Sequence, residues 1–244
     1  MGKMIYRMFE DLDSFISRDP AARNRLEVFL CYPGYHSILF YRFANAFWRR
    51  RFFLIGRLIS NFGKIFTGIE IHPGSTVGRR LFIDHGNGVV IGETSEIGND
   101  VTIYQGVTLG GTSLEKGKRH PTLLDNVIVG SGAQVLGPIT VGEGARIGAN
   151  AVVLTDVPKD ATMVGIPAKV AMGHDKKSRD NFTAYGTPTD ELPDPITGSF
   201  ETIRTQINIL VERIDILEKH YAELSQFEKN DETDIEPPIS SSGG

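Results

Sequence analysis

The sequence has little cysteine, no strong excess of charge and no long apolar run, and each scarcity excludes a class of protein. The one cysteine, Cys31, excludes a disulfide framework and fits a reducing compartment. No N-terminal stretch has the basic, apolar and small-residue order of a signal peptide. The most apolar window, residues 52–59, is too short and too basic at its flanks to span a bilayer. We therefore expect a cytoplasmic protein without a membrane partner.

Length and charge further limit which classes of protein the chain can belong to. At 244 residues the chain can bury one main domain and carry appendages. A formal charge of −4 and a pI of about 5.9 argue against a nucleic acid as the main partner.

Residues 1–68 are aromatic and basic, with apolar residues at helical spacing. Pro20 and the pair Pro33-Gly34 interrupt this pattern. The segment therefore predicts an N-terminal domain of several short helices.

Residues 69–172 carry a repeat of six that is typical of a parallel β-helix. In such a fold each hexad supplies one short strand with one inward aliphatic side chain, and small residues turn the corner between strands. An antiparallel sheet would show a period of two instead. The period slips by two residues before Ile91, and after Leu109 it resumes only at Val129. The aliphatic positions are Ile71, Val77, Ile83, Ile91, Ile97, Ile103, Leu109, Val129, Val135, Val141, Ile147 and Val153.

The interruption between Leu109 and Val129 is longer than one hexad and contains Lys118, Arg119 and His120. A rigid coil cannot absorb an insertion, so we expect a protruding loop that carries functional residues.

The C-terminal part has three segments. Residues 173–199 are polar and rich in Pro and Gly, which predicts a linker. Residues 200–228 show a heptad pattern that predicts a coiled-coil helix, and isoleucine at both core positions favours more than two strands. An amphipathic helix folded back on its own chain is the alternative. Residues 229–244 predict a disordered tail.

Histidines and carboxylates gather in the first coils and the loop. Glu70 and His85 are fifteen residues apart, a little less than one coil of three hexads, so they can lie on neighbouring coils. A carboxylate beside an imidazole can orient it as a general base for a hydroxyl. A single histidine of this kind would be an ordinary surface residue, but the conjunction favours catalysis.

These segments also carry a family resemblance, which spans residues 18–172. The elements GIEIHPGSTVG, DHG, VTLGGT and KRHP occur in order, followed by VGIPAK and preceded by RDPA and GYH. The chain thereby resembles the serine acetyltransferases of bacteria and plants. The resemblance implies a left-handed parallel β-helix and transfer of an acetyl group from acetyl-CoA to the hydroxyl of L-serine. It implies direct transfer in a ternary complex, without an acyl-enzyme.

The resemblance also implies a role for each matching residue. His85 matches the general base, and Glu70 matches the carboxylate that pairs with it, where many members have Asp. The positions that match serine-binding residues are Asp19, Asp84, Arg119 and His120. Acetyl-CoA is expected between subunits, near Gly110, Gly111, Thr112, Ser131, Ala149 and Lys169.

The family further implies partners. L-cysteine is expected as a feedback inhibitor that mimics serine. The N-terminal domain is shorter than in members that form a dimer of trimers, so a homotrimer is equally expected. Members that dock into O-acetylserine sulfhydrylase end in isoleucine, whereas this chain ends Ser-Gly-Gly, which makes that complex doubtful.

Four alternatives stay open at this point. The acceptor can be homoserine or a sugar in another hexapeptide acyltransferase. A zinc lyase of the γ-carbonic anhydrase type needs three histidines on neighbouring coils, and Asp125 stands where the third would fall, so we expect no metal. A non-catalytic trimeric scaffold leaves the cluster around His85 unexplained. Cys31 as a covalent nucleophile lies outside the motifs.

Overall fold

The structure is a computed structural model of the chain, and it describes residues 2–172, 204–214 and 216–218. The chain divides into two units, residues 1–192 and residues 193–244, which are described separately. None of the described helices is long and apolar enough to cross a membrane.

The N-terminal segment is helical, and local sequence signals set the helix ends. The Asn24 side chain accepts a hydrogen bond from the Glu27 N–H and so caps the second helix. Pro33 occupies the first position of the third helix, where its missing N–H is not needed. Gly68 ends the fourth helix in a left-handed conformation with φ of 71°. The helices are α1 (Gly2–Arg18), α2 (Arg25–Cys31), α3 (Pro33–Arg49) and α4 (Phe53–Thr67).

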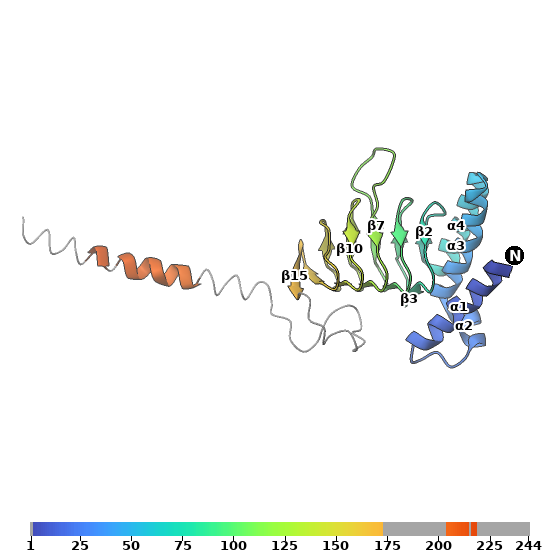
Figure 1. Cartoon of the computed structure of the whole chain (residues 1–244), viewed down its shortest axis with the longest axis horizontal. Helices are drawn as coiled ribbons and strands as arrows, with labels where there is room; N and C mark the ends of the chain where they lie inside the picture. The colour runs from blue at the N-terminus through green and yellow to red at the C-terminus, as the bar shows by residue number, and fades with distance from the viewer. Residues whose placement is uncertain (1, 173–203, 215, 219–244) are drawn as a thin grey trace, which may run out of the picture. The chain divides into compact units, whose positions relative to one another are not determined.

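Residues 70–172 form three sheets of short strands that the chain visits in rotation (Figure 1). Sheet A contains β1 (Glu70–Ile71), β4 (Val90–Ile91), β7 (Thr108–Gly110), β10 (Gln134–Leu136) and β13 (Val152–Val153). Sheet B contains β2 (Thr76–Val77), β5 (Glu96–Ile97), β8 (Thr122–Leu123) and β11 (Thr140–Val141). Sheet C contains β3 (Phe82–Ile83), β6 (Thr102–Ile103), β9 (Ile128–Val129), β12 (Arg146–Ile147), β14 (Thr162–Gly165) and β15 (Ala168–Met172).

The strands of neighbouring coils pair in parallel, and only the closing pair β14–β15 is antiparallel among the described strands. Three parallel sheets visited in rotation are typical of a left-handed β-helix. The predicted fold class, an N-terminal helical region followed by this β-helix, is therefore confirmed.

The core of the β-helix is the predicted column of aliphatic side chains. All twelve predicted positions are at most 6% exposed. Burial of one such side chain contributes about 1.5–3 kcal/mol. One detail of the prediction is wrong: the period resumes at Leu123, which is 1% exposed, and not first at Val129.

The strand register locates two insertions in an otherwise regular coil. Thr122 pairs with Thr140 one regular coil later, which is a repeat of 18 residues. Glu70 pairs with Val90, two residues more than this repeat, and Glu96 pairs with Thr122, eight residues more. The short insertion lies between sheets C and A, and the long one lies between sheets A and B. We call these positions the C–A corner and the A–B corner.

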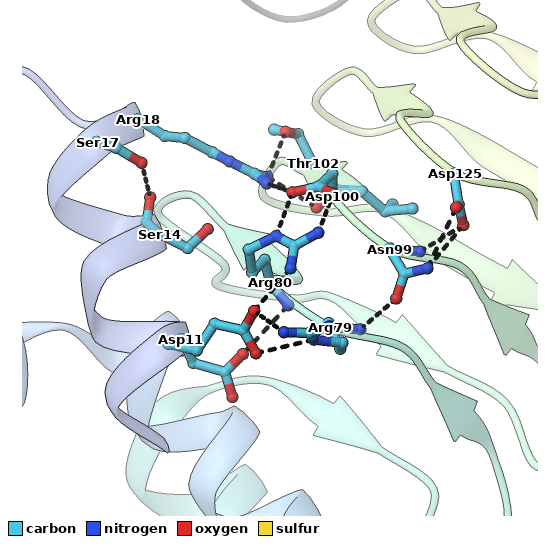
Figure 2. Close-up of polar contacts among 12 residues, drawn as sticks. Asp11, Ser14, Ser17, Arg18, Arg79, Arg80, Asn99, Asp100, Thr102 and Asp125 are labelled. Atoms are coloured by element: carbon cyan, nitrogen blue, oxygen red, sulfur yellow. Dashed lines mark hydrogen bonds and ion pairs between the residues drawn. The ribbon is translucent and has the colours of Figure 1, made fainter. Parts of the chain in front are cut away.

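Ion pairs attach α1 to the first coils at the corner between sheets B and C (Figure 2). Glu10 binds both Arg79 and Arg80. Arg80 and Arg18 both bind Asp100, at 2.5 and 2.9 Å. The hydrogen-bonded Arg80 guanidinium is the main reason that the pKa of Asp100 lies below its usual range. This network holds the helical segment in place against the end of the β-helix.

In the second unit, residues 204–214 and 216–218 are helical. Ile207, Leu210 and Ile214 from the predicted heptad are 52–56% exposed in the single chain. The predicted linker 173–199, the tail 229–244 and the rest of the predicted coiled coil 200–228 lie outside the described residues. The coiled coil therefore stays a prediction.

We predict that Asp100→Asn lowers the free energy of unfolding by about 1 kcal/mol at pH 7, because two charge-assisted pairs are weakened and solvent screens part of their energy. The folded-state pKa of Asp100 is lowered, so its contribution is complete above the pKa of the unfolded carboxyl and is lost as the pH falls through the folded pKa. Denaturant unfolding of both proteins at equal concentration, at pH 7 and in acid, measures this difference.

Asp13→Asn is the matched control, because Asp13 forms an exposed pair with Arg25. It should change stability by less than about 0.5 kcal/mol. Equal losses in the two variants would contradict the role given to Asp100.

Candidate active site

His85 occupies the two-residue insertion at the C–A corner. Its backbone is left-handed, with φ of 58°, and the next residue, Gly86, has φ of 64°. A residue with a side chain adopts this conformation at a cost of about 1 kcal/mol, which the surrounding coil must offset. The result is an imidazole that stands out from the coil and is 67% exposed.

One carboxylate lies beside this imidazole, and a second lies near the first. Asp84 Oδ1 lies 3.8 Å from His85 Nε2. Burial raises the pKa of Asp84, the His85 charge opposes that shift, and the nearby Asp19 carboxylate adds to it. Asp19 comes from the turn after α1 and accepts a hydrogen bond from the Tyr32 hydroxyl at 2.8 Å. Burial, followed by the Asp19 hydrogen bond, raises the pKa of Tyr32 to about 12, so this hydroxyl keeps its proton at neutral pH.

Glu70 is placed differently from the prediction. Its carboxylate binds Lys64 Nζ of α4 at 2.5 Å, whereas the ion-pair partner of His85 is Asp84. The predicted pairing of Glu70 with His85 is therefore not formed within this chain. The physical reason is that Glu70 precedes the inward Ile71 on β1, so its side chain points out of sheet A toward the last turn of α4.

The long insertion at the A–B corner positions Arg119. Its Nη2 forms an ion pair with Oε2 of Glu93, one coil earlier. Lys118 lies beside it and binds Glu96 at 3.0 Å and the Thr94 carbonyl at 2.9 Å. These contacts fix the C-terminal end of the loop onto the preceding coil.

His120 is held against the same coil and is 8% exposed. A Cβ on Gly92 would lie 2.0 Å from its ring, so a glycine is required there. The Nδ1 atom of His120 accepts a hydrogen bond from the Thr94 backbone N–H at 3.2 Å. Because an amide N–H can only donate, the ring proton is on Nε2.

Burial, together with the neighbouring Arg119 charge, lowers the pKa of His120 below its usual value. The ring is therefore neutral at pH 7 and is a hydrogen-bond donor through Nε2. Thr94 Oγ1 also accepts from the backbone amides of Arg119 and His120, at 3.0 and 3.1 Å. One threonine thus sets both the position and the tautomer of this histidine.

The residues expected from the sequence divide between two places, which we call half-sites. The C–A half-site consists of Asp19, Asp84, His85, Ser131 and Ala149, all at or beside the C–A corner. The A–B half-site consists of Gly110, Gly111, Thr112, Arg119 and His120. Lys169 lies apart from both on β15. Sheet A separates the two corners, so a single chain does not bring His85 together with Arg119 and His120.

Three residues that contact the half-sites carry no motif signal of their own: Tyr32, Glu93 and Thr94. The coil register would have revealed the last two. Once the period resumes at Leu123, the segment 93–94 falls one coil below 119–120, as the pairing of Glu96 with Thr122 shows.

Within the described residues, no three side chains of His, Cys, Asp or Glu lie close enough together to hold a metal ion. Cys31 is exposed on α2 and belongs to neither half-site.

Comparison with known proteins first defines the class. Residues 120–155 match the family model described as bacterial transferase hexapeptide (six repeats). This match agrees with the repeat and the fold, and together with the curated relatives it places the chain among the hexapeptide-repeat transferases.

Curated relatives define the family within that class. The serine acetyltransferase of Bacillus subtilis is 54% identical over 205 residues, which are 84% of this chain and 92% of that protein. The serine acetyltransferase of Helicobacter pylori is 62% identical over 158 residues, which are 65% of this chain and 92% of that protein. The chain belongs to the serine acetyltransferase family.

Solved structures agree and include complexes with three different ligands. A Neisseria gonorrhoeae serine acetyltransferase in complex with serine has a TM-score of 0.68 at 36% identity, and the match covers 70% of each chain. A serine acetyltransferase in complex with cysteine has a TM-score of 0.69 at 38% identity, covering 72% of this chain and 68% of that one. A complex with CoA has a TM-score of 0.66 at 40% identity, covering 69% and 70%.

We predict that Thr94→Val lowers kcat/KM for acetyl transfer by about 10- to 100-fold, because two partly buried backbone amides lose their acceptor and Arg119 and His120 shift. Steady-state release of CoA thiol measures the change.

Thr94→Ser is the matched control, since it keeps the hydroxyl and should stay within about threefold of the wild type. If the valine and serine variants are equally active, the hydroxyl does not position the half-site.

Proposed function

We propose that the chain transfers the acetyl group of acetyl-CoA to the hydroxyl of L-serine and so produces O-acetyl-L-serine and CoA. The observation that carries this proposal is the exposed His85 imidazole beside the Asp84 carboxylate, with Asp19 near Asp84, in a chain that belongs to the serine acetyltransferase family. The proposed product makes this the first step of cysteine biosynthesis.

The proposed mechanism transfers the acetyl group directly to serine, through a tetrahedral intermediate. His85 takes the proton of the serine hydroxyl as the serine oxygen bonds to the thioester carbonyl carbon. The C–S bond then breaks, and the imidazolium returns the proton to the departing thiolate of CoA. No group of the chain is acetylated, which is consistent with the position of Cys31 outside both half-sites.

Charge supports an amino acid as the acceptor. The carboxylates of Asp19 and Asp84 can hold the ammonium group of serine. Arg119 can bind the serine carboxylate in bidentate fashion, and Glu93 holds the guanidinium for this purpose. His120 can donate from Nε2 to the substrate carboxylate or to the developing oxyanion.

We propose that each complete site forms between two copies of the chain, with the C–A half-site of one copy facing the A–B half-site of the next. The support is that the expected serine contacts and the expected CoA contacts divide between the same two corners. Ser131 and Ala149 lie with His85, whereas Gly110, Gly111 and Thr112 lie with Arg119. In a closed ring of three copies, or in a dimer of such trimers, every half-site faces a complementary half-site of a neighbouring copy. Lys169 is proposed to meet a phosphate of CoA.

The remaining proposals concern an inhibitor, the cellular location and the cofactor. L-cysteine is the expected inhibitor, since its ammonium and carboxylate groups match those of serine, and a related enzyme is solved in complex with cysteine. A cytoplasmic location is proposed on the single cysteine of the chain. We propose no metal cofactor.

A hexapeptide acetyltransferase for homoserine is the second candidate, because one extra methylene changes neither the ammonium nor the carboxylate contact. A sugar acceptor would offer no charged group for Asp19, Asp84 and Arg119 to bind.

The test measures CoA thiol release from acetyl-CoA with L-serine, with L-homoserine or with no acceptor. We expect serine-dependent release, and His85→Ala should lower kcat/KM by about 100-fold or more, as for loss of a general base. Release only with homoserine would reassign the acceptor, and no release with either would overturn the proposal.

Glu70→Gln is the matched carboxylate variant. Because Glu70 binds Lys64, we expect its kcat/KM to stay within about threefold of the wild type. A loss of about tenfold or more would instead place Glu70 beside His85 in the assembled enzyme.

A further inference from the structure

A cavity of about 980 Å³ lies between α3 and the first coil of the β-helix. Its walls are the C-terminal half of α3, the segment 74–78 around β2, and Arg7 of α1. None of the residues of the two half-sites lines it. The volume is that of a pocket for a small molecule the size of a nucleotide.

The charge of the cavity has one sign. Among the residues that the structure describes, four arginines line it, and no aspartate or glutamate does. The chain as a whole has a formal charge of −4, so this concentration of positive charge is local. Within the described residues, three of the four have no carboxylate within ion-pair distance. The four arginines are Arg7, Arg42, Arg49 and Arg50, and Arg42 is the one with such a partner.

Arg42 is the arginine of this group whose side chain is held in place by hydrogen bonds. Its side chain is 8% exposed, and its guanidinium donates to the carbonyls of Val77 at 3.1 Å and Gly78 at 2.9 Å. Its carboxylate partner is the buried Asp11, at 3.4 Å, and burial raises the pKa of that carboxyl. The Nε atom of Arg42 is buried and has no hydrogen-bond partner among the described residues. A buried donor without a partner is uncommon in folded proteins. Because this atom is closed to solvent, it does not itself reach a ligand in the cavity.

An aromatic wall completes the cavity. Trp48 lines it and is held edge-on by Phe53 and His72, with ring centroids 4.8 and 5.1 Å away. Planar guanidinium groups bind phosphate oxygens in pairs, and an indole offers an apolar surface beside them. No lysine is among the described residues that line the cavity, which favours a ligand with several phosphate oxygens.

We propose that this cavity is a second binding site, for a small anion that carries a diphosphate or triphosphate group. Arg7, Arg49 and Arg50 bind the phosphate oxygens, Arg42 forms the floor, and Trp48 forms one wall. The site is separate from the acetyl-CoA site, although CoA also contains a diphosphate.

Two probe ligands distinguish binding of a phosphate chain alone from binding of a nucleotide. Inorganic pyrophosphate tests the phosphate chain alone, and ATP tests the same chain on a nucleoside. Each is titrated into the full-length enzyme by calorimetry, with and without saturating CoA. Trp48 is the one tryptophan of the chain, so its fluorescence reports pyrophosphate binding at the cavity itself.

We expect at least one of the two probes to bind in the presence of CoA and to change the Trp48 emission. Arg49→Gln/Arg50→Gln should weaken that binding by about tenfold or more, since two charge-assisted contacts are lost. Both arginines are exposed and lie outside the half-sites, so the variant should fold and keep its acetyl-transfer activity.

Arg23→Gln/Arg51→Gln is the matched control, because it removes the same charge from two exposed arginines that do not line the cavity. It should bind the probe within about twofold of the wild type. The proposal is overturned if neither probe binds, if CoA abolishes the binding, or if the two double variants bind equally well.

Discussion

Each strand of the β-helix has room for one inward aliphatic side chain, and hydrogen bonds between coils fix the position of every following strand. Extra residues cannot enter such a coil and must leave it at a corner. The chain uses this constraint twice. Two extra residues present His85 at the C–A corner, and eight extra residues bring Arg119 and His120 to the A–B corner. The ends of both insertions are held rigidly, because they connect to coils that are hydrogen-bonded to their neighbours.

The same constraint explains why one chain holds two halves of a site. Sheet A keeps the two corners apart, so the imidazole with its carboxylates and the guanidinium with its neutral histidine cannot meet within a chain. Each half is already ordered: Tyr32 holds Asp19, and Thr94 holds His120 as an Nε2–H donor. Assembly would therefore bring together two preformed surfaces, which lowers the conformational cost of building the site.

The fold was predictable because its signal repeats. Twelve aliphatic residues in phase identify the β-helix, and Pro33 and Gly68 mark helix ends by their backbone preferences. The site was predictable only in part. The motifs located His85 and Arg119, but the wrong point of resumption, Val129 in place of Leu123, concealed the alignment of Thr94 with His120. The pairing of Glu70 with Lys64 depends on how α4 packs against β1, which no local pattern encodes.

Subunit complementation tests the shared site most directly. His85→Ala and Arg119→Ala are each expected to be inactive alone, because each removes one half of every site. Co-expressed in equal amounts, they should form mixed oligomers in which about a quarter of the interfaces join an intact C–A half-site to an intact A–B half-site. Recovery of about that fraction of wild-type activity is the expected result. Mixed oligomers as inactive as either variant alone would contradict a site built from two copies.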